Sequence, residues 1–232
     1  MTPEKKLLDA EAAALLAELE QVGSLEELRT ATRQPPGRAL GLDPAALTHR
    51  QRIAGRIFRD CSQSPGQQAA KELLRELPAA GTILHAILPG TFTPLDLVPA
   101  VLELANATAK EVHLSTLGFS SANVQTLCAL LDSKAIRALS LVCSRYFAAA
   151  SKEIFTTAER ELPPRGARLI ATRSHCKVML LQLTNGDRWV VEGSGNLRSC
   201  VCLEQVSLCN DPALYRFHRT WLRRVLSEKE SR

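Results

Sequence analysis

The sequence predicts an α/β fold in which a mixed β-sheet is flanked by helices, with an α-helical extension at the N-terminus. From residue 82 onward, short apolar runs alternate with amphipathic helical segments, which is typical of a sheet with helices on its faces. Before residue 80, strong helix formers dominate and no segment is a convincing strand. We therefore expect two parts, a helical region at residues 1–80 and a sheet domain at residues 81–232.

The N-terminal region is predicted to contain at least three helices. Residues 4–20 combine helix-forming residues with an apolar stripe. Ser24 and Glu27 have the spacing of a capping box, which opens a second short helix. A third helix is expected to begin with Pro44 in its first turn and to continue through the basic stretch at residues 50–59.

In the sheet domain, strands and helices are expected in alternation. The expected strands are 82–88, 111–117, 138–143 and 167–172, and the helices between them are 94–106, 120–132 and 148–162. A hairpin is predicted next, because an apolar run at 178–183 and a second run at 189–191 flank an Asn-Gly turn. The last helix, at 212–226, has apolar residues at helical spacing, which predicts that one of its faces is buried.

Composition limits the class of protein. The 232 residues are 45% hydrophobic and 23% charged, which is ordinary for a soluble globular protein. No apolar run approaches the roughly 18 residues of a membrane span, and the first residues do not resemble a secretory signal. Seven cysteines at irregular spacing do not resemble a disulfide framework. A cytoplasmic protein without a membrane element is therefore expected.

The net charge of +5 is concentrated in basic stretches, among them residues 50–59 and 216–224. Stretches of this kind either bind polyanions such as nucleic acid or form solvated helix faces. The sequence leaves both interpretations open.

Four side chains around the predicted hairpin indicate an anion site. His175 and Lys177 are two apart on a segment expected to be extended, so that both point to the same face. The hairpin is expected to bring Ser194 and Asn196 back to the same level. An imidazole, a fixed cation and two short hydrogen-bonding side chains can converge on one anion, and a phosphate group fits this set.

These residues carry a resemblance to a known family. His175-Cys-Lys177 followed by Gly193-Ser-Gly-Asn196 resembles the HxK and GSxN signature of the phospholipase D superfamily. Arg198-Ser199 and Glu204 match positions that follow this signature. The resemblance covers about two thirds of the chain. More narrowly, the chain is similar to small, single-motif members found in bacteriophages and prophages, and three segments carry that similarity: Leu117-Gly-Phe-Ser120, Leu141-Val-Cys-Ser144 and Glu192–Ser199.

The resemblance implies a metal-independent phosphodiesterase that needs no cofactor. In this family a motif histidine attacks phosphorus and forms a covalent phosphohistidine, so His175 is the expected nucleophile. Glu204 would hold the other ring nitrogen. Lys177 and Asn196, with help from Ser194, would bind the nonbridging oxygens and stabilise the charge of the transition state.

The chain contains one copy of the motif, and it departs from the family pattern at two positions. Because a second histidine is needed to protonate the leaving oxygen, the resemblance implies a homodimer in which two copies complete one active site. Gln182 stands where the motif has an aspartate, and Cys202 stands where an asparagine often precedes Glu204.

The expected substrate is nucleic acid and the expected activity that of an endonuclease, because the chain is basic and has no membrane element. The alternative is a non-catalytic phospholipase D-like module that binds DNA or regulates a phage or prophage process. A lipid phosphodiesterase lacks a membrane-binding segment to support it. A zinc site is disfavoured because the cysteines near His175 include no CxxC pair; they are Cys176, Cys200, Cys202 and Cys209.

Overall fold

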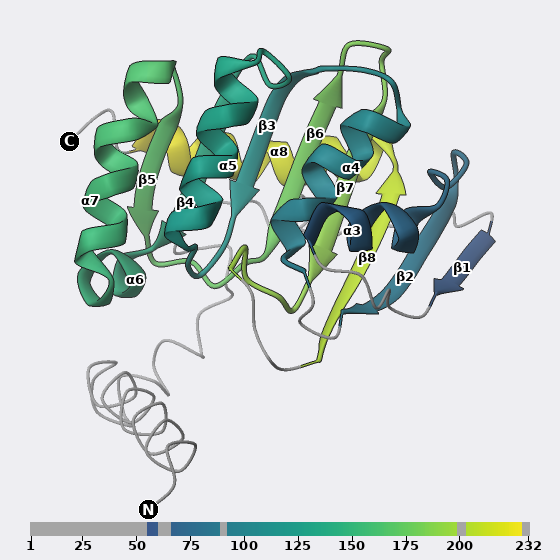
Figure 1. The fold of residues 1–232 in the computed structure, drawn as a ribbon, viewed down its shortest axis with the longest axis horizontal. Coiled ribbons are helices and arrows are strands. Elements are labelled where there is room, and N and C mark those ends of the chain that lie inside the picture. The colour runs from purple at the N-terminus through teal and green to yellow at the C-terminus, as the bar shows by residue number, and fades with distance from the viewer. Residues whose placement is uncertain (1–54, 60–65, 89–91, 199–202, 229–232) are drawn as a thin grey trace, which may run out of the picture. The chain divides into compact units, whose positions relative to one another are not determined.

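A computed structural model describes residues 55–59, 66–88, 92–198 and 203–228. The helices expected over residues 4–20, after Ser24 and from Pro44 to residue 54 lie outside these ranges. The described chain contains one eight-stranded sheet in the order β1-β2-β8-β7-β6-β3-β4-β5 (Figure 1). The expected fold class, a mixed sheet flanked by helices, is confirmed.

Elements alternate along the chain as expected. The strands are β1 (Gly55–Arg59), β2 (Thr82–Leu88), β3 (Ala109–Ser115), β4 (Leu139–Ser144), β5 (Arg168–Thr172), β6 (Val178–Leu183), β7 (Arg188–Gly193) and β8 (Glu204–Asn210). The α-helices are α3 (Gly66–Leu74), α4 (Leu97–Leu104), α5 (Ser121–Asp132), α6 (Arg145–Ala150), α7 (Lys152–Glu161) and α8 (Pro212–Glu228). Short 3-10 helices, η3 (Pro94–Asp96) and η4 (Pro163–Arg165), precede α4 and β5. No helix among the described residues is both long enough and apolar enough to cross a bilayer.

The strand directions place the ends of several strands at one edge of the sheet. β3, β4 and β5 pair in parallel, as do β1 and β2, whereas β6 and β8 run antiparallel to their neighbours. The carboxyl ends of β3, β4, β5 and β7 therefore lie at the same edge as the first residues of β6 and β8 (Figure 1). We call this the site edge, because side chains from segments far apart in sequence meet there.

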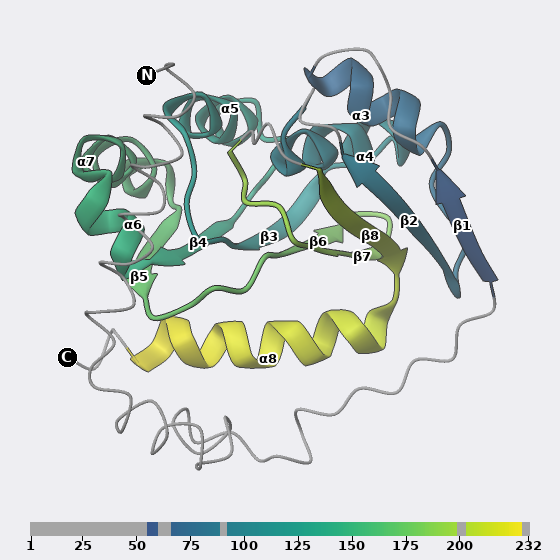
Figure 2. The ribbon, with the colours of Figure 1, turned by 90° about the horizontal axis from the view of Figure 1, so that it is seen from below.

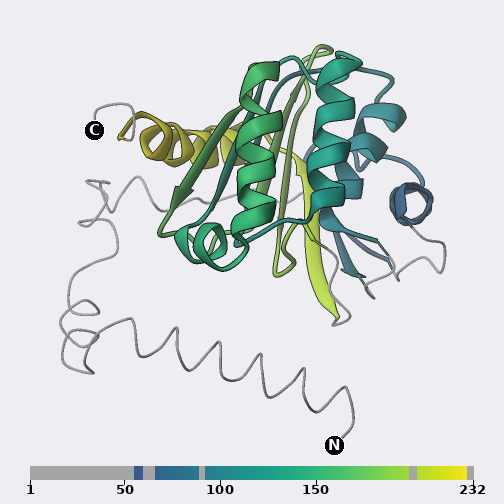
Figure 3. The same cartoon turned by 60° about the vertical axis from the view of Figure 1, so that its left-hand side comes forward.

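The helices cover the two faces of the sheet unequally. Of the described helices, α3 to α7 lie on one face and α8 lies across the other (Figures 2 and 3). Strand alternation sends Leu114 and Met179 into the core under the first face, and Val178 and Leu180 into the smaller core under α8. The second core includes Leu222 of α8, which is fully buried.

The structure differs from the sequence expectations in several places. Residues 55–59 form a strand, not part of a helix, and this strand pairs in parallel with β2. The expected domain boundary near residue 80 therefore falls inside the sheet domain. Strand β8 was not foreseen as a strand. The helix expected at 148–162 is two helices that meet at Ser151, whose backbone is not helical.

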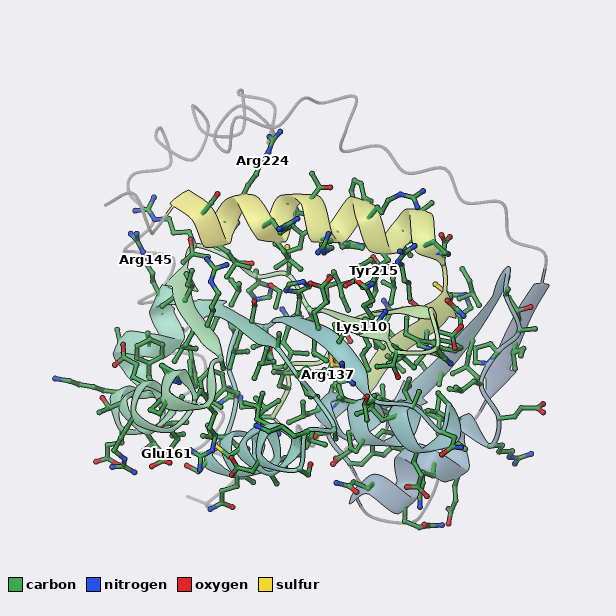
Figure 4. The ribbon with its side chains drawn as sticks, turned by 90° about the horizontal axis from the view of Figure 1, so that it is seen from above. Lys110, Arg137, Arg145, Glu161, Tyr215 and Arg224 are labelled. Carbon is green, nitrogen blue, oxygen red and sulfur yellow. The ribbon has the colours of Figure 1, made fainter. Side chains whose placement is uncertain are left out.

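A partly buried ionic cluster joins α8 to the sheet. The carboxylate of Glu111 on β3 accepts a hydrogen bond from Tyr215 Oη at 2.9 Å and pairs with Arg219 Nε at 2.7 Å. His113 Nε2 lies 3.6 Å away, at an ion-pair distance. Figure 4 shows Tyr215 in the layer between α8 and the sheet. The neighbouring His113, followed by hydrogen bonds from Arg219 and Tyr215, lowers the pKa of Glu111 to about 2.

Glu111→Gln is expected to lower the free energy of unfolding by about 2 kcal/mol at neutral pH, because a hydrogen-bonded charge is lost. Since the pKa of this carboxyl is lowered in the folded chain, its contribution is complete above about pH 4.5 and is lost as pH falls toward about 2. Urea titrations at pH 7 and pH 3 check this, and the variant should lose less stability on acidification than the wild type. Glu103→Gln is the control, since that side chain is 64% exposed; an equal effect there would contradict the prediction.

Candidate active site

The HxK segment lies in the connection between β5 and β6, at the site edge. Residues 173–177 follow the strand without being part of it, and His175 and Lys177 meet in this connection. Lys177 Nζ lies 2.6 Å from His175 Nδ1 and donates to the His175 carbonyl at 3.0 Å. Ser115, at the end of β3, donates from its hydroxyl to the Cys176 carbonyl at 3.1 Å and so fixes the loop on the sheet.

Lys177 is the half-buried cation of the site. Burial lowers its pKa, and the negative charge of Glu204 opposes this shift only in part. The ammonium group is therefore held with few solvent partners at the place where the sequence predicted an anion. An incoming anion would replace the missing solvation, which favours its binding at this position.

The Gly193–Asn196 segment leaves β7 at the same edge and is held by β8. The Ser194 amide donates to the Gln205 carbonyl at 3.1 Å, and the Gln205 amide donates back to Ser194 Oγ at 3.0 Å. Ser194 Oγ in turn donates to the Glu204 carboxylate. The hydroxyl of Ser194 is thus engaged with Glu204, and the two side chains form a pair that fixes the segment.

Asn196 is oriented by the end of β3. Its Oδ1 accepts from the Leu117 amide at 3.1 Å and from Thr116 Oγ1 at 3.4 Å. Because the oxygen is occupied, the amide NH₂ is the group of Asn196 that remains to donate to a ligand. Thr116 also accepts from the Leu197 amide at 3.2 Å, so the segment is attached on both sides of Asn196.

Residues from both segments line one small pocket. Lys177, Glu192 and Gly195 contribute to it, together with Ser115 from β3 and Pro94 from η3. An imidazole, an ammonium and an amide NH₂ at the site edge can bind an anion without a metal. In the described part of the chain, no group of three or more His, Cys, Asp or Glu side chains could hold a metal ion.

Gly193 is required where β7 meets β8, because a Cβ at this position would overlap the Gln205 carbonyl oxygen. Gly193→Ala is expected to lower the free energy of unfolding by about 1–3 kcal/mol, as for other overpacked sites. Denaturant titration measures the loss. Ser207→Ala, on the facing strand β8, removes atoms without inserting any and is the control. A variant as stable as the wild type would show that the two strands separate easily.

The structure places all five expected site residues at the site edge. His175 and Lys177 are in contact, and Ser194 and Asn196 lie on the adjoining segment. Glu204 is paired with Ser194 in this structure, and its expected role in orienting His175 stays a prediction.

Sequence reasoning missed the residues that hold the site in place. Ser115 and Thr116 anchor the two motif segments. Their signal was available, because a Ser-Thr pair directly after an apolar strand marks the carboxyl end of a parallel strand, where ligands bind.

Gln182 does not belong to the site. It lies in β6, opposite Glu111 on β3 and Arg188 on β7. Five residues of extended chain separate it from Lys177, which is roughly 17 Å at about 3.4 Å per residue. The motif aspartate expected at position 182 of β6 is a glutamine here. The residue directly opposite on β3, Glu111, carries a carboxylate.

No family model matches this sequence, and the comparison with curated proteins finds no match. Among solved structures, the fold is similar to the phospholipase D family member Nuc from Salmonella typhimurium, with a TM-score of 0.45 and 18% identity over 61% of this chain and 92% of that one. Polyphosphate kinase from Porphyromonas gingivalis gives a TM-score of 0.41 and 15% identity, over 63% of this chain and 25% of the kinase. Yeast tyrosyl-DNA phosphodiesterase gives 0.33 and 13%, over 68% of this chain and 57% of that protein.

Proposed function

We propose that this chain is a metal-independent phosphodiesterase of the phospholipase D type, an endonuclease that acts through a covalent phosphohistidine at His175. One observation carries the proposal. The HxK and GSGN segments, separated by a hairpin, converge on the site edge, where His175 Nδ1 and Lys177 Nζ are 2.6 Å apart. That convergence is what the family resemblance requires of the two segments.

The chemistry follows from the donors and acceptors present. A phosphodiester bound at the site edge takes donors from the Lys177 ammonium and the Asn196 amide, which frees the His175 ring from Lys177. A neutral ring nitrogen then attacks phosphorus, and the bond from phosphorus to the leaving oxygen breaks. A general acid protonates that oxygen. Water afterwards attacks the phosphohistidine and releases His175, so that the enzyme is regenerated.

In this proposal the general acid comes from a second copy of this chain. Among the described histidines other than His175, His113 and His218 are buried under α8 and His85 lies in the middle of β2. His175 of a second copy, related by a two-fold axis, would supply the acid. Mixing tests this: wild type co-assembled with excess His175→Ala should lose activity far beyond dilution. Activity of a strictly monomeric protein would contradict the proposed dimer.

Nucleic acid is the proposed substrate because the site edge continues into an exposed basic and aromatic surface. Arg145 and Tyr146 follow β4 directly, and Arg173 follows β5. All three are exposed or nearly so, with Tyr146 at 39%. Arginines that contact phosphates and an aromatic ring that stacks on a base are the usual elements of single-strand binding.

Cleavage in EDTA tests the function. Purified protein is incubated with plasmid DNA, with single-stranded DNA and with a simple chromogenic phosphodiester, each with EDTA in excess. EDTA-resistant cleavage supports the proposal. Salt-sensitive retention of DNA without cleavage of any of the three substrates would favour the non-catalytic DNA-binding module instead.

Gln182→Asp is expected to change the cleavage rate by less than about twofold, because residue 182 lies roughly 17 Å along β6 from Lys177. The measurement is kcat/KM on the simple phosphodiester. The control is a thermal melt, since a new carboxylate opposite Glu111 is expected to lower stability through like-charge repulsion across the strands. A large gain in rate would show that the missing aspartate limits catalysis.

A further inference from the structure

The basic stretch of α8, whose role the sequence left open, divides between two faces of the helix. Arg219 turns toward the sheet and pairs with Glu111 on β3. Arg216, Arg223 and Arg224 are exposed, and Figure 4 shows Arg224 projecting from α8 away from the sheet. From Arg216 to Arg224 the helix rises about 12 Å, at about 1.5 Å per residue. We call the outer surface formed by these three residues the arginine face.

The arginine face has no carboxylate beside it among the described side chains of α8. The other exposed side chains described on this helix are uncharged, and they are Pro212, Ala213, Thr220 and Ser227. Neither Arg216 nor Arg223 has a side-chain partner in the described part of the chain. Cations on one helix face repel one another when no opposite charge lies between them. An incoming polyanion would relieve that repulsion, so its binding is favoured here.

Helix α7 provides the contrast, because its exposed face is that of an ordinary solvated helix. Its exposed charges include both signs, and they are Lys152, Glu153, Glu159 and Arg160. Arg160 Nε also donates to Glu161 at 2.9 Å, so that this cation is neutralised within its own helix. A surface of mixed sign keeps a protein soluble without attracting a polyanion. The arginine face of α8 carries one sign only, which solubility does not require.

The opposite face of α8 is committed to the sheet, which fixes the direction of the arginine face. Leu214, Leu222 and Leu226 are buried in the core under α8. His218 Nε2 lies 2.9 Å from Glu192 Oε1, so that a polar bridge also joins α8 to β7. A helix that inserts into a bilayer surface needs a free apolar face, and that face of α8 is already buried against the sheet. The partner of the arginine face is therefore recognised by charge and hydrogen bonds.

The arginine face connects to the site edge along the edge strand β5. Arg168, at the start of β5, donates to the Leu226 carbonyl near the C-terminal end of α8 at 3.0 Å. Arg173 lies five residues further on, beyond the other end of β5, which is roughly 17 Å at about 3.4 Å per residue. Arg145 lies at the end of the sheet toward which the C-terminal end of α8 points (Figure 4). All three arginines are exposed, so a phosphate backbone that follows β5 meets cations at both of its ends.

We infer that the arginine face of α8 is a second binding surface for the phosphate backbone of a nucleic acid that also occupies the site edge. The inference rests on the proposed function for the class of substrate, but binding at α8 does not depend on turnover. The path along β5 and α8 is together roughly 30 Å long, so only a long substrate reaches Arg216. The contact is independent of base sequence, because guanidinium groups on this face would bind phosphates and not base edges.

The salt dependence of DNA binding tests the inference. Wild type and a double variant, Arg216→Gln with Arg223→Gln, are titrated with a fluorescent DNA duplex of about 24 base pairs at several salt concentrations. Each lost phosphate contact lowers the slope of log K against log salt by about 0.9. The double variant should therefore show a slope lower by about 2 and bind roughly tenfold more weakly at moderate salt. An unchanged slope would overturn the inference.

A matched control separates this contact from a general effect of net charge. Arg75→Gln with Lys134→Gln removes the same two charges at exposed residues that follow α3 and α5, on the other face of the sheet. The slope should stay at the wild-type value in this control, and equal slopes in the two double variants would overturn the inference. Thermal melts verify the fold of both, since exposed substitutions usually change stability by less than about 0.5 kcal/mol.

Two further measurements distinguish failure of this inference from failure of the proposed function. In cleavage assays the α8 double variant should lose far more kcat/KM on the duplex than on the simple chromogenic phosphodiester, which is too small to reach α8. A chain that binds the duplex with the expected slopes but never cleaves it counts against the proposed function alone. Retention on vesicles of anionic lipid that is lost in the double variant, with DNA binding unchanged, would assign the arginine face to a membrane surface and overturn the inference. Failure of the wild type to bind the duplex would overturn it as well.

Discussion

His175→Ala is expected to reduce EDTA-resistant phosphodiester cleavage by at least about 10⁴-fold, because in the proposed mechanism it removes the atom that forms the bond to phosphorus. Losses of this order, or larger, follow when a covalent nucleophile is deleted. The site offers no replacement. Lys177 carries the positive charge and is half-buried, and Ser194 is engaged with Glu204. Initial rates on the simple phosphodiester measure the effect without contributions from DNA binding.

Cys176→Ser is the matched control, because it alters the same connection at the neighbouring exposed residue and leaves the carbonyl that Ser115 holds. It should retain near wild-type activity. Acid quenching of the wild type with ³²P-labelled substrate should trap label on the protein, and His175→Ala should trap none. Activity that survives the substitution would exclude His175 as nucleophile, whatever the effect on DNA binding.

The fold was predictable wherever local pattern and tertiary pairing agree. Strands β2 and β6 have the bounds that the sequence analysis predicted, because each is an apolar run between turn signals. Strand β1 was missed because its five residues, Gly-Arg-Ile-Phe-Arg, have little strand pattern of their own and depend on parallel pairing with β2. Strand β8 was missed for a similar reason, since polar residues and the motif glutamate occupy its first half.

The site was predictable as a set of residues but not as a set of contacts. The signature placed His175 and Lys177 beside Asn196, because motif spacing and a hairpin suffice for that. It could not show that Ser194 pairs with Glu204, since this contact depends on the register between β7 and β8. The bridge from α8 to Glu192 was equally inaccessible, because it joins residues 26 apart across a helix and a strand.

The absence of the motif aspartate is a further case in which the sequence does not show the contact that matters. In the sequence, Gln182 suggests a damaged active site. In the structure it faces Glu111, whose carboxylate is bound by Tyr215 and Arg219 at the junction of α8 and the sheet. The departure therefore lies at the attachment of α8, at a distance from the candidate site, and it does not argue against the proposed function.

Lys177→Met is expected to reduce kcat/KM about 10²- to 10³-fold, because it removes the cation that stabilises charge developing on the nonbridging oxygens. Methionine keeps most of the aliphatic stem, so packing in the pocket changes little. Lys110→Met is the matched control, since it makes the same change of net charge at an exposed residue on the opposite edge of the sheet, labelled in Figure 4. A similar loss in both variants would indicate a general electrostatic effect and would contradict a role for Lys177 at phosphorus.

The pH dependence of the cleavage rate is a second test of the role of the Lys177 charge. Burial lowers the pKa of Lys177, so its ammonium loses its proton at a lower pH than an exposed lysine does. Activity that requires this charge should therefore fall on the alkaline side below about pH 10.4, the ordinary lysine value. Lys177→Arg carries a guanidinium that does not titrate in this range, and its residual activity should persist to higher pH. An alkaline limb that stays in place in Lys177→Arg would assign that limb to another group and leave Lys177 with binding alone.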